Sequence, residues 1–182
     1  MKSTHIITRG LLDMVTGEAK SSPRLRRNFN FHAGDEAPCH RLLNAMEPDS
    51  YIPPHRHLDP EKDETMIVLR GRLGVIFFDD RGNIRETALL TTGGDAVGVN
   101  IPHGAFHTVV CLESGTVFFE SKAGPYRTLT SGERPTWAPA EGSEGGTNIS
   151  PDSAGSGRRS TARAGSIRKP FSSDDSNCRI KD

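Results

Sequence analysis

Residues 54–64 read PHRHLDPEKDE and place two histidines, His55 and His57, two positions apart, with Glu64 closing the stretch. In an extended chain successive side chains point to opposite sides, so His55 and His57 project from one side and Arg56 from the other. Two imidazoles and a carboxylate so placed can present two nitrogens and one oxygen to a single ion, a mixed set that transition metals accept. We therefore interpret the stretch as half of a metal site.

A second segment, residues 101–111, reads IPHGAFHTVVC and offers a further ligand, His107. Pro102 and Gly104 indicate a turn, and His107 opens the apolar strand that follows it. We expect His55, His57, Glu64 and His107 to hold one divalent transition metal ion. His103 lies in the turn, outside the ligand positions; a proton donor at the rim of the site is the less favoured reading, and we do not assign it to the site.

These two segments resemble the sequence motifs of the cupins. The first cupin motif is H-x-H, a short gap and E-x6-G, and the second ends in P-x-G-x-x-H. The matching residues are His55, His57, Glu64 and Gly71 for the first motif, and Pro102, Gly104 and His107 for the second. The resemblance implies a small β-barrel with a metal held by three His and one Glu.

Two positions depart from the cupin pattern. Six residues separate His57 from Glu64 where the pattern allows three or four, so Glu61 is a rival ligand. We prefer Glu64 because it gives the E-x6-G spacing and begins an apolar strand, whereas Glu61 follows Pro60 in a loop. Cys111 stands where the second motif usually has Asn, a residue that is not normally a ligand.

A closer resemblance is to the WbuC-type cupins, bacterial proteins linked with surface-polysaccharide gene clusters. It covers residues 9–142 and rests on five separate matches, at residues 22–32, 41–48, 68–73, 124–126 and 137–142. The resemblance implies the cupin fold and metal site, together with a sugar-derived substrate. It leaves the reaction open.

The 182 residues suit one domain with an appendage, because the apolar runs are concentrated before about residue 137. We expect an N-terminal helix and strand packing on the barrel over residues 1–38 and a cupin barrel over residues 39–140. Leu11, Leu12, Val15 and Ala19 fall at helical spacing behind Thr8, a candidate N-cap, so a helix should end before Ser21. Residues 141–182 are rich in Gly, Ser and charge, and we expect a disordered tail.

From residue 39 onward the chain reads as short strands separated by Gly, Pro and Asp. They are expected at residues 39–47, 51–57, 64–70, 73–79, 84–90, 96–101, 105–111 and 115–122. This spacing favours an all-β protein closed as a jelly-roll barrel. Several strands are apolar on both faces, so a symmetric partner could cover one of them, and we expect a homodimer.

A basic cluster, Arg24, Arg26 and Arg27, precedes the aromatic strand that contains Phe29 and Phe31. Its arginines could bind a phosphate or carboxylate of a small-molecule ligand through paired hydrogen bonds, which makes Arg24 and Arg26 candidate substrate-binding residues. Alternatively, they form a solvated strand edge whose charge discourages pairing with other chains. The sequence pattern is compatible with both readings.

The composition indicates which partners and which cellular location to expect. The formal net charge is zero, so neither nucleic acid nor an anionic membrane is an expected partner. The three cysteines show no C-x-x-C spacing, and no stretch approaches the ~18 apolar residues of a membrane span. We expect a cytoplasmic protein.

Several functions fit three imidazoles and a carboxylate. Zn, Fe, Mn and Ni all accept this donor set. The first hypothesis is a metal-dependent enzyme that acts on a small sugar-derived or anionic molecule; an Fe(II)-dependent dioxygenase is one form of it. The second is a non-catalytic, metal-assisted binding module. The third is a metalloprotein whose ion only stabilises the barrel. No catalytic side chain beyond the metal ligands is assigned.

Overall fold

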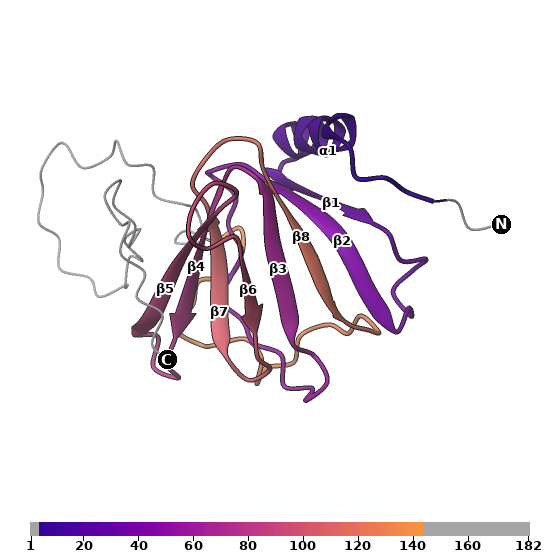
Figure 1. Cartoon of the computed structure of the whole chain (residues 1–182). Helices are drawn as coiled ribbons and strands as arrows, with labels where there is room; N and C mark the ends of the chain where they lie inside the picture. Colours follow the sequence, from indigo (N-terminus) through magenta and orange to yellow (C-terminus); the bar gives the residue numbers. More distant parts are fainter. Residues whose placement is uncertain (1–3, 144–182) are drawn as a thin grey trace, which may run out of the picture.

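The computed structural model describes residues 4–143, which form one helix followed by eight strands (Figure 1). The elements are α1 (Arg9–Ser21), β1 (Arg26–Asn30), β2 (Cys39–Met46), β3 (Glu64–Arg70), β4 (Arg72–Phe78), β5 (Ile84–Thr91), β6 (Gly98–Ile101), β7 (Phe106–Cys111) and β8 (Thr116–Ala123). The expected disordered tail lies outside the described residues, apart from its first three positions. Among the described residues, no helix is long and apolar enough to cross a membrane.

The strands form two antiparallel sheets, one with the order β1-β2-β8-β3-β6 and one with the order β5-β4-β7. An isolated antiparallel bridge between His55 and His107 adds a short extended segment beside β7. From β2 to β8 the chain therefore passes repeatedly from one sheet to the other, which is the strand order of a jelly roll. The all-β jelly roll with a short N-terminal helix that the sequence predicts is confirmed.

The strand expected at residues 51–57 is wrong. Only His55 pairs there, through its amide to the carbonyl of His107 (3.0 Å) and through the amide of His107 to its own carbonyl (2.9 Å). Pro53 and Pro54 precede it and have no amide hydrogen to donate, so a longer ladder cannot form on this side. His55 and His57 lie instead on a loop that has this one bridge and two further backbone hydrogen bonds. The amide of Arg56 donates to the carbonyl of Glu133 (3.1 Å), and the amide of Gly104 donates to the carbonyl of His57 (2.6 Å).

The core between the two sheets is built from the inward positions of the strands. Its buried residues include Met46, Met66, Val75, Cys111 and Phe118. The same alternation directs Glu64 of β3 and His107 of β7 inward, beside this core. Cys111 is fully buried. This is expected because it lies four residues after His107 on the same strand and therefore points to the same side.

Helix α1 covers the outer face of the larger sheet. The Thr8 hydroxyl caps it by accepting a hydrogen bond from the amide of Leu11 (3.2 Å). Its buried residues Val15 and Ala19 pack against Leu43 of β2 and Val117 of β8. Where β2 and β8 meet the helix, Leu43 and Val117 face α1, whereas Met46 and Phe118 face the core between the sheets.

Gly71 explains the glycine of the E-x6-G motif. It joins β3 to β4 with φ +78°, and a Cβ at this position would lie 2.8 Å from the Cα of Thr116. Only glycine adopts this turn without strain. The glycine therefore lets the turn after β3 pass close to the first residue of β8, next to the point where the β3–β8 register shifts between Val68 and Arg70.

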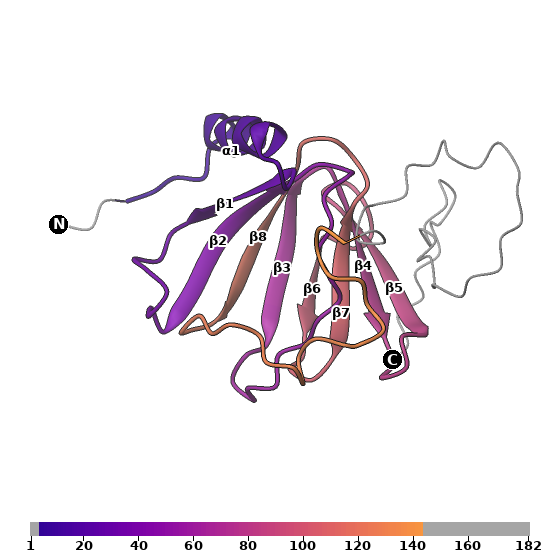
Figure 2. The ribbon, with the colours of Figure 1, turned by 180° about the vertical axis from the view of Figure 1, so that it is seen from behind.

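After β8 the chain continues as a segment without strands, residues 124–143, which we call the strap. Figure 2 shows it in orange, leaving β8 and running along the end of the sheets. Trp137 anchors the strap by packing on Phe78 and Phe106, with ring centroids 5.0 and 6.0 Å away. The sequence-based expectation that this tryptophan holds the segment against the barrel is confirmed.

Candidate metal centre

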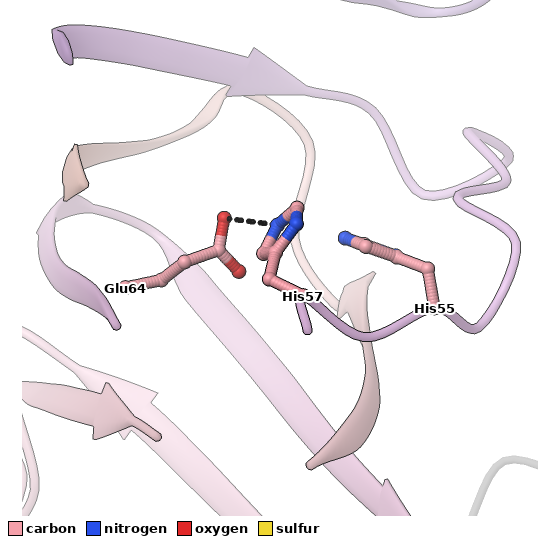
Figure 3. Close-up of side chains that lie close together, drawn as sticks. All are labelled: His55, His57 and Glu64. Atoms are coloured by element: carbon pink, nitrogen blue, oxygen red, sulfur yellow. Dashed lines mark hydrogen bonds and ion pairs between the residues drawn. The ribbon is translucent and has the colours of Figure 1, made fainter. Parts of the chain in front are cut away.

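Three of the predicted ligands meet at one end of the barrel. His55 and His57 come from the loop between β2 and β3, and Glu64 is the first residue of β3. One ligand atom from each lies within 4.8 Å of the others. Figure 3 shows the three side chains pointing toward one another, with the Nε2 of His57 3.1 Å from Oε1 of Glu64.

His107 approaches Glu64 from the opposite sheet, but it is not part of the group whose ligand atoms all lie within 4.8 Å of one another. Its Nε2 lies 2.9 Å from Oε2 of Glu64, and its ring centroid lies 4.6 Å from that of His55. Within residues 4–143, neither Nε2 of His107 nor Oε2 of Glu64 has a hydrogen-bond partner of acceptable geometry, although both atoms are buried. Buried polar atoms are almost always satisfied, and a cation between these two would satisfy both. The donor set therefore fits a metal ion.

Backbone carbonyls fix the orientation of two imidazoles. Nδ1 of His55 lies 3.0 Å from the carbonyl oxygen of Pro53, and Nδ1 of His107 lies 3.0 Å from that of Ala105. A carbonyl can only accept, so Nδ1 carries the proton in both rings. Each Nε2 is then left with its lone pair facing the site, as a metal ligand requires.

The electrostatics keep the ligands in the protonation states that bind metal. Burial, together with the nearby His107, lowers the pKa of His55 from 6.5 to about 4, so this imidazole is neutral at pH 7. Burial alone would raise the pKa of Glu64, but its interactions with His107 and His57 when those rings are protonated, together with the charge of Lys122, outweigh that effect and hold the pKa well below its usual value. Neutral imidazole and ionised carboxylate are the forms that coordinate a cation.

A buried polar network adjoins the ligands, and we did not predict it from the sequence. Lys122 donates to Oε1 of Glu64 (2.6 Å) and pairs with Oε1 of Glu120 (2.7 Å), while Asn44 donates to the other oxygen of Glu120 (2.8 Å). Burial opposes the charge on Lys122, but Glu120 and Glu64 raise its pKa above the usual value. The sequence did carry a signal for this network. Glu120 and Lys122 lie two and four residues after the buried Phe118 on one strand, so their side chains point to the same inward face.

Three of the four proposed ligands and this network line a cavity of about 380 Å³ between the sheets, whereas His57 is not part of its wall. Its wall includes His55, Glu64, His107, Glu120 and Lys122. A purely structural metal site is closed by its protein ligands, whereas a site that opens on a polar cavity can admit a small molecule.

A larger hollow of about 1080 Å³ adjoins the cavity, and we call it the arginine groove. The two hollows share Asn28, Asn30, Asn44, Ile52 and His55. The candidate substrate-binding residues Arg24 and Arg26 line the groove, where both pair with Glu141 of the strap. The structure thus brings the predicted arginines next to the predicted metal centre.

Other residues considered from the sequence lie apart from the ligand cluster. Glu61 is exposed in the loop before β3, and its amide donates to Asp59 (3.0 Å). His103 is exposed and lies with Nδ1 3.0 Å from Asp63. The choice of Glu64 over Glu61 stays a prediction, and the geometry favours it because Glu64 is 2% exposed and faces the histidines.

Comparison with known proteins finds one family model that matches part of the chain and several solved structures with a similar fold. Residues 7–90 match the model of a family described as a domain of unknown function (DUF6016). No curated protein matches the chain.

Among solved structures, KdgF from Halomonas sp. is similar at 19% identity and a TM-score of 0.43, over 58% of this chain and 84% of that chain. An oxalate oxidase in complex with the substrate analogue glycolate is similar at 17% identity and a TM-score of 0.46, over 59% of this chain and 55% of that chain. The oxalate decarboxylase of Lactobacillus farciminis in a formate complex is similar at 17% identity and a TM-score of 0.42, over 57% of this chain and 29% of that chain. The chain thus spans about half the length of the oxalate oxidase. These are similarities of fold.

Proposed function

We propose that this protein is a metal-dependent enzyme of the cupin superfamily that binds one divalent transition metal ion through His55, His57, Glu64 and His107. The observation that carries the proposal is the facing pair of buried atoms, Nε2 of His107 and Oε2 of Glu64, which lie 2.9 Å apart without a hydrogen bond. The ion would act as a Lewis acid on a hydroxyl or carbonyl oxygen of the ligand. Zn, Fe, Mn and Ni suit this donor set.

The cavity beside the ligands supports a role in binding or catalysis over a purely structural one. A small molecule in it would meet the ammonium of Lys122 as a hydrogen-bond donor and the carboxylate of Glu120 as an acceptor. Both groups are held in place, since Lys122 bridges Glu64 and Glu120, and Asn44 fixes Glu120 from the other side. Side chains that are fixed before the ligand arrives can orient it without further loss of entropy.

The ligand we propose is small and either sugar-derived or anionic. The polar wall of the cavity and the arginines of the adjoining groove support an anionic group, with Arg24 and Arg26 orienting it. The resemblance to WbuC-type cupins supports a place in bacterial surface-polysaccharide metabolism. A cytoplasmic location belongs to the same proposal.

A homodimer is also part of the proposal. Ile67 of β3 and Val97 beside β6 remain 42% and 47% exposed, and their strands are adjacent in the larger sheet. Apolar side chains exposed close together on a sheet suit a contact with a second copy.

Turnover separates an enzyme from the alternative, a binding module whose ion holds a ligand without converting it. The test is to incubate the metal-loaded protein with a panel of neutral sugars and uronic acids and to follow each compound by proton NMR. Metal-dependent conversion of one of them is expected, with loss of conversion in His57→Ala. If a compound binds and stays unchanged, the protein is a binding module, and with iron bound, oxygen consumption would mark a dioxygenase. If none of these compounds binds, the proposed ligand class is wrong.

A further inference from the structure

The arginine groove concentrates positive charge beside the metal centre. Four arginines line it, Arg24, Arg26, Arg27 and Arg134, together with one acidic side chain, Glu141. The charge of Arg27 is already paired with Glu18 of α1 (2.9 Å), so Arg24, Arg26 and Arg134 supply the positive charge of the groove. His55 lines both the groove and the metal cavity, so a molecule in the groove lies next to a proposed metal ligand. The groove is therefore placed to bind part of whatever reaches the metal.

Glu141 lies in the groove as a bound carboxylate would. Arg24 donates through Nε to Oε1 (2.8 Å) and through Nη2 to Oε2 (2.7 Å), and Arg26 donates through Nη2 to Oε1 (2.7 Å). The Arg24 pair is the two-bond fork that guanidinium groups form with carboxylates. Three charge-assisted hydrogen bonds converge on one planar group, which defines a carboxylate-shaped site.

Arg26 is fixed independently of Glu141. Its Nη1 donates to the carbonyl oxygen of Tyr51 (2.9 Å), and its side chain is 12% exposed. Arg24 is 62% exposed, and among the described residues the hydrogen bonds of its guanidinium all go to Glu141. Arg26 is thus held in a fixed position in the groove wall, whereas the side chain of Arg24 is free to reorient toward a bound ligand.

The strap does not depend on Glu141 for its position. The hydroxyl of Tyr51 donates to the carbonyl oxygen of Pro139 (2.9 Å), and Trp137 packs on the barrel. The Glu141 carboxylate is 33% exposed and the Arg24 side chain 62%, so a dissolved anion can reach this ion pair from solvent. A competing anion can therefore displace this carboxylate while the strap stays in place.

We propose that Arg24 and Arg26 form a carboxylate-binding subsite beside the metal centre, and that Glu141 occupies it until the carboxylate of a ligand displaces it. This inference rests on the proposed function and narrows its ligand to a carboxylated molecule, such as a sugar acid. The metal centre and the subsite then hold different parts of the same ligand.

The test measures binding of D-glucuronate by isothermal titration calorimetry, with D-glucose as the neutral counterpart, to the full-length metal-loaded protein. Glu141→Gln should bind glucuronate about tenfold more tightly than the wild type, because a tethered carboxylate competes at an effective concentration in the millimolar range. Adding Arg24→Gln to this variant should abolish the gain. Glu36→Gln, which breaks an exposed ion pair with Arg127, is the matched control and should leave the affinity unchanged.

Three outcomes would overturn the inference: equal glucuronate affinity in the wild type and in Glu141→Gln, an equal gain for glucose, or tighter binding of inorganic phosphate than of glucuronate. Thermal unfolding of each variant shows whether the fold is retained. Metal content is measured on the same samples. Bound metal without a gain in affinity would overturn the subsite and leave the metal centre standing, whereas a gain without bound metal would contradict the proposed function alone.

Discussion

The ammonium of Lys122 donates a 2.6 Å hydrogen bond to Oε1 of Glu64, the carboxylate whose other oxygen faces His107 without a hydrogen bond. Lys122 and Nε2 of His57 (3.1 Å) thus both lie against Oε1 of Glu64, whereas Oε2 faces Nε2 of His107. Lys122 also partly neutralises the buried Glu120, so the metal-free site is stabilised by this one ammonium.

Lys122→Met tests that role. Removing the ammonium leaves two buried carboxylates without their cation, which should lower the free energy of unfolding of the metal-free protein by about 2–3 kcal/mol. Added metal should restore more stability in the variant than in the wild type, because it now supplies the missing positive charge and meets less repulsion. Thermal unfolding with and without metal measures both effects, with Lys20→Met on the exposed face of α1 as control. Equal stability of the metal-free variant and wild type would contradict this role.

Glu64→Gln tests the choice of carboxylate ligand. The amide cannot supply the charged oxygen that faces His107, so metal affinity should fall by at least about 100-fold, more than the loss of a residue that merely supports a ligand would cause. Glu61→Gln should bind metal like the wild type, since Glu61 is exposed in the loop. Competition with a chromogenic chelator gives both affinities. The reverse pattern would assign the ligand to Glu61.

The lowered pKa of His55 predicts how the metal-free protein responds to acid. Between pH 6.5 and about 4 the unfolded chain binds a proton at this imidazole, whereas the folded chain does not. Stability should therefore fall as the pH is lowered through this window, by on the order of 3 kcal/mol for the full shift. Glu64, with its lowered pKa, adds to the loss only below its unfolded value of 4.5.

Denaturant unfolding of the chelator-treated protein at pH 7, 6, 5 and 4 measures this dependence. His55→Gln should show a clearly flatter profile between pH 6.5 and 4.5, where Glu64 does not yet contribute. An identical profile in the two proteins would mean that His55 is not the group responsible.

The sequence predicted most of the fold because alternation and turn residues mark the strands directly. Glu64–Arg70 begins and ends where the pattern placed it, and Thr8 caps the helix as expected. The exception at residues 51–57 has a local cause, since Pro53 and Pro54 allow a single bridge where alternation favoured a strand. The alternation of apolar and polar residues does not show that a proline lacks the amide hydrogen that a strand needs for pairing.

The site was predicted less completely. Motif spacing pointed to the four proposed ligands, of which the structure clusters His55, His57 and Glu64 and places His107 next to Glu64. Lys122 and Glu120 were missed because an ion pair inside a barrel depends on which strands are neighbours, and β8 lies between β2 and β3 only once the jelly roll is closed. The pairing of Arg24 with Glu141 joins residues 117 positions apart, and no local pattern connects them.

Elemental analysis of the protein purified without chelators or added metals tests the central claim most directly, beside a His57→Ala variant prepared in the same way. The account predicts close to one equivalent of a transition metal in the wild type and its loss in the variant. The element found would then indicate which chemistry to assay. Absence of metal from both proteins, or equal metal content in the two, would contradict the proposed site.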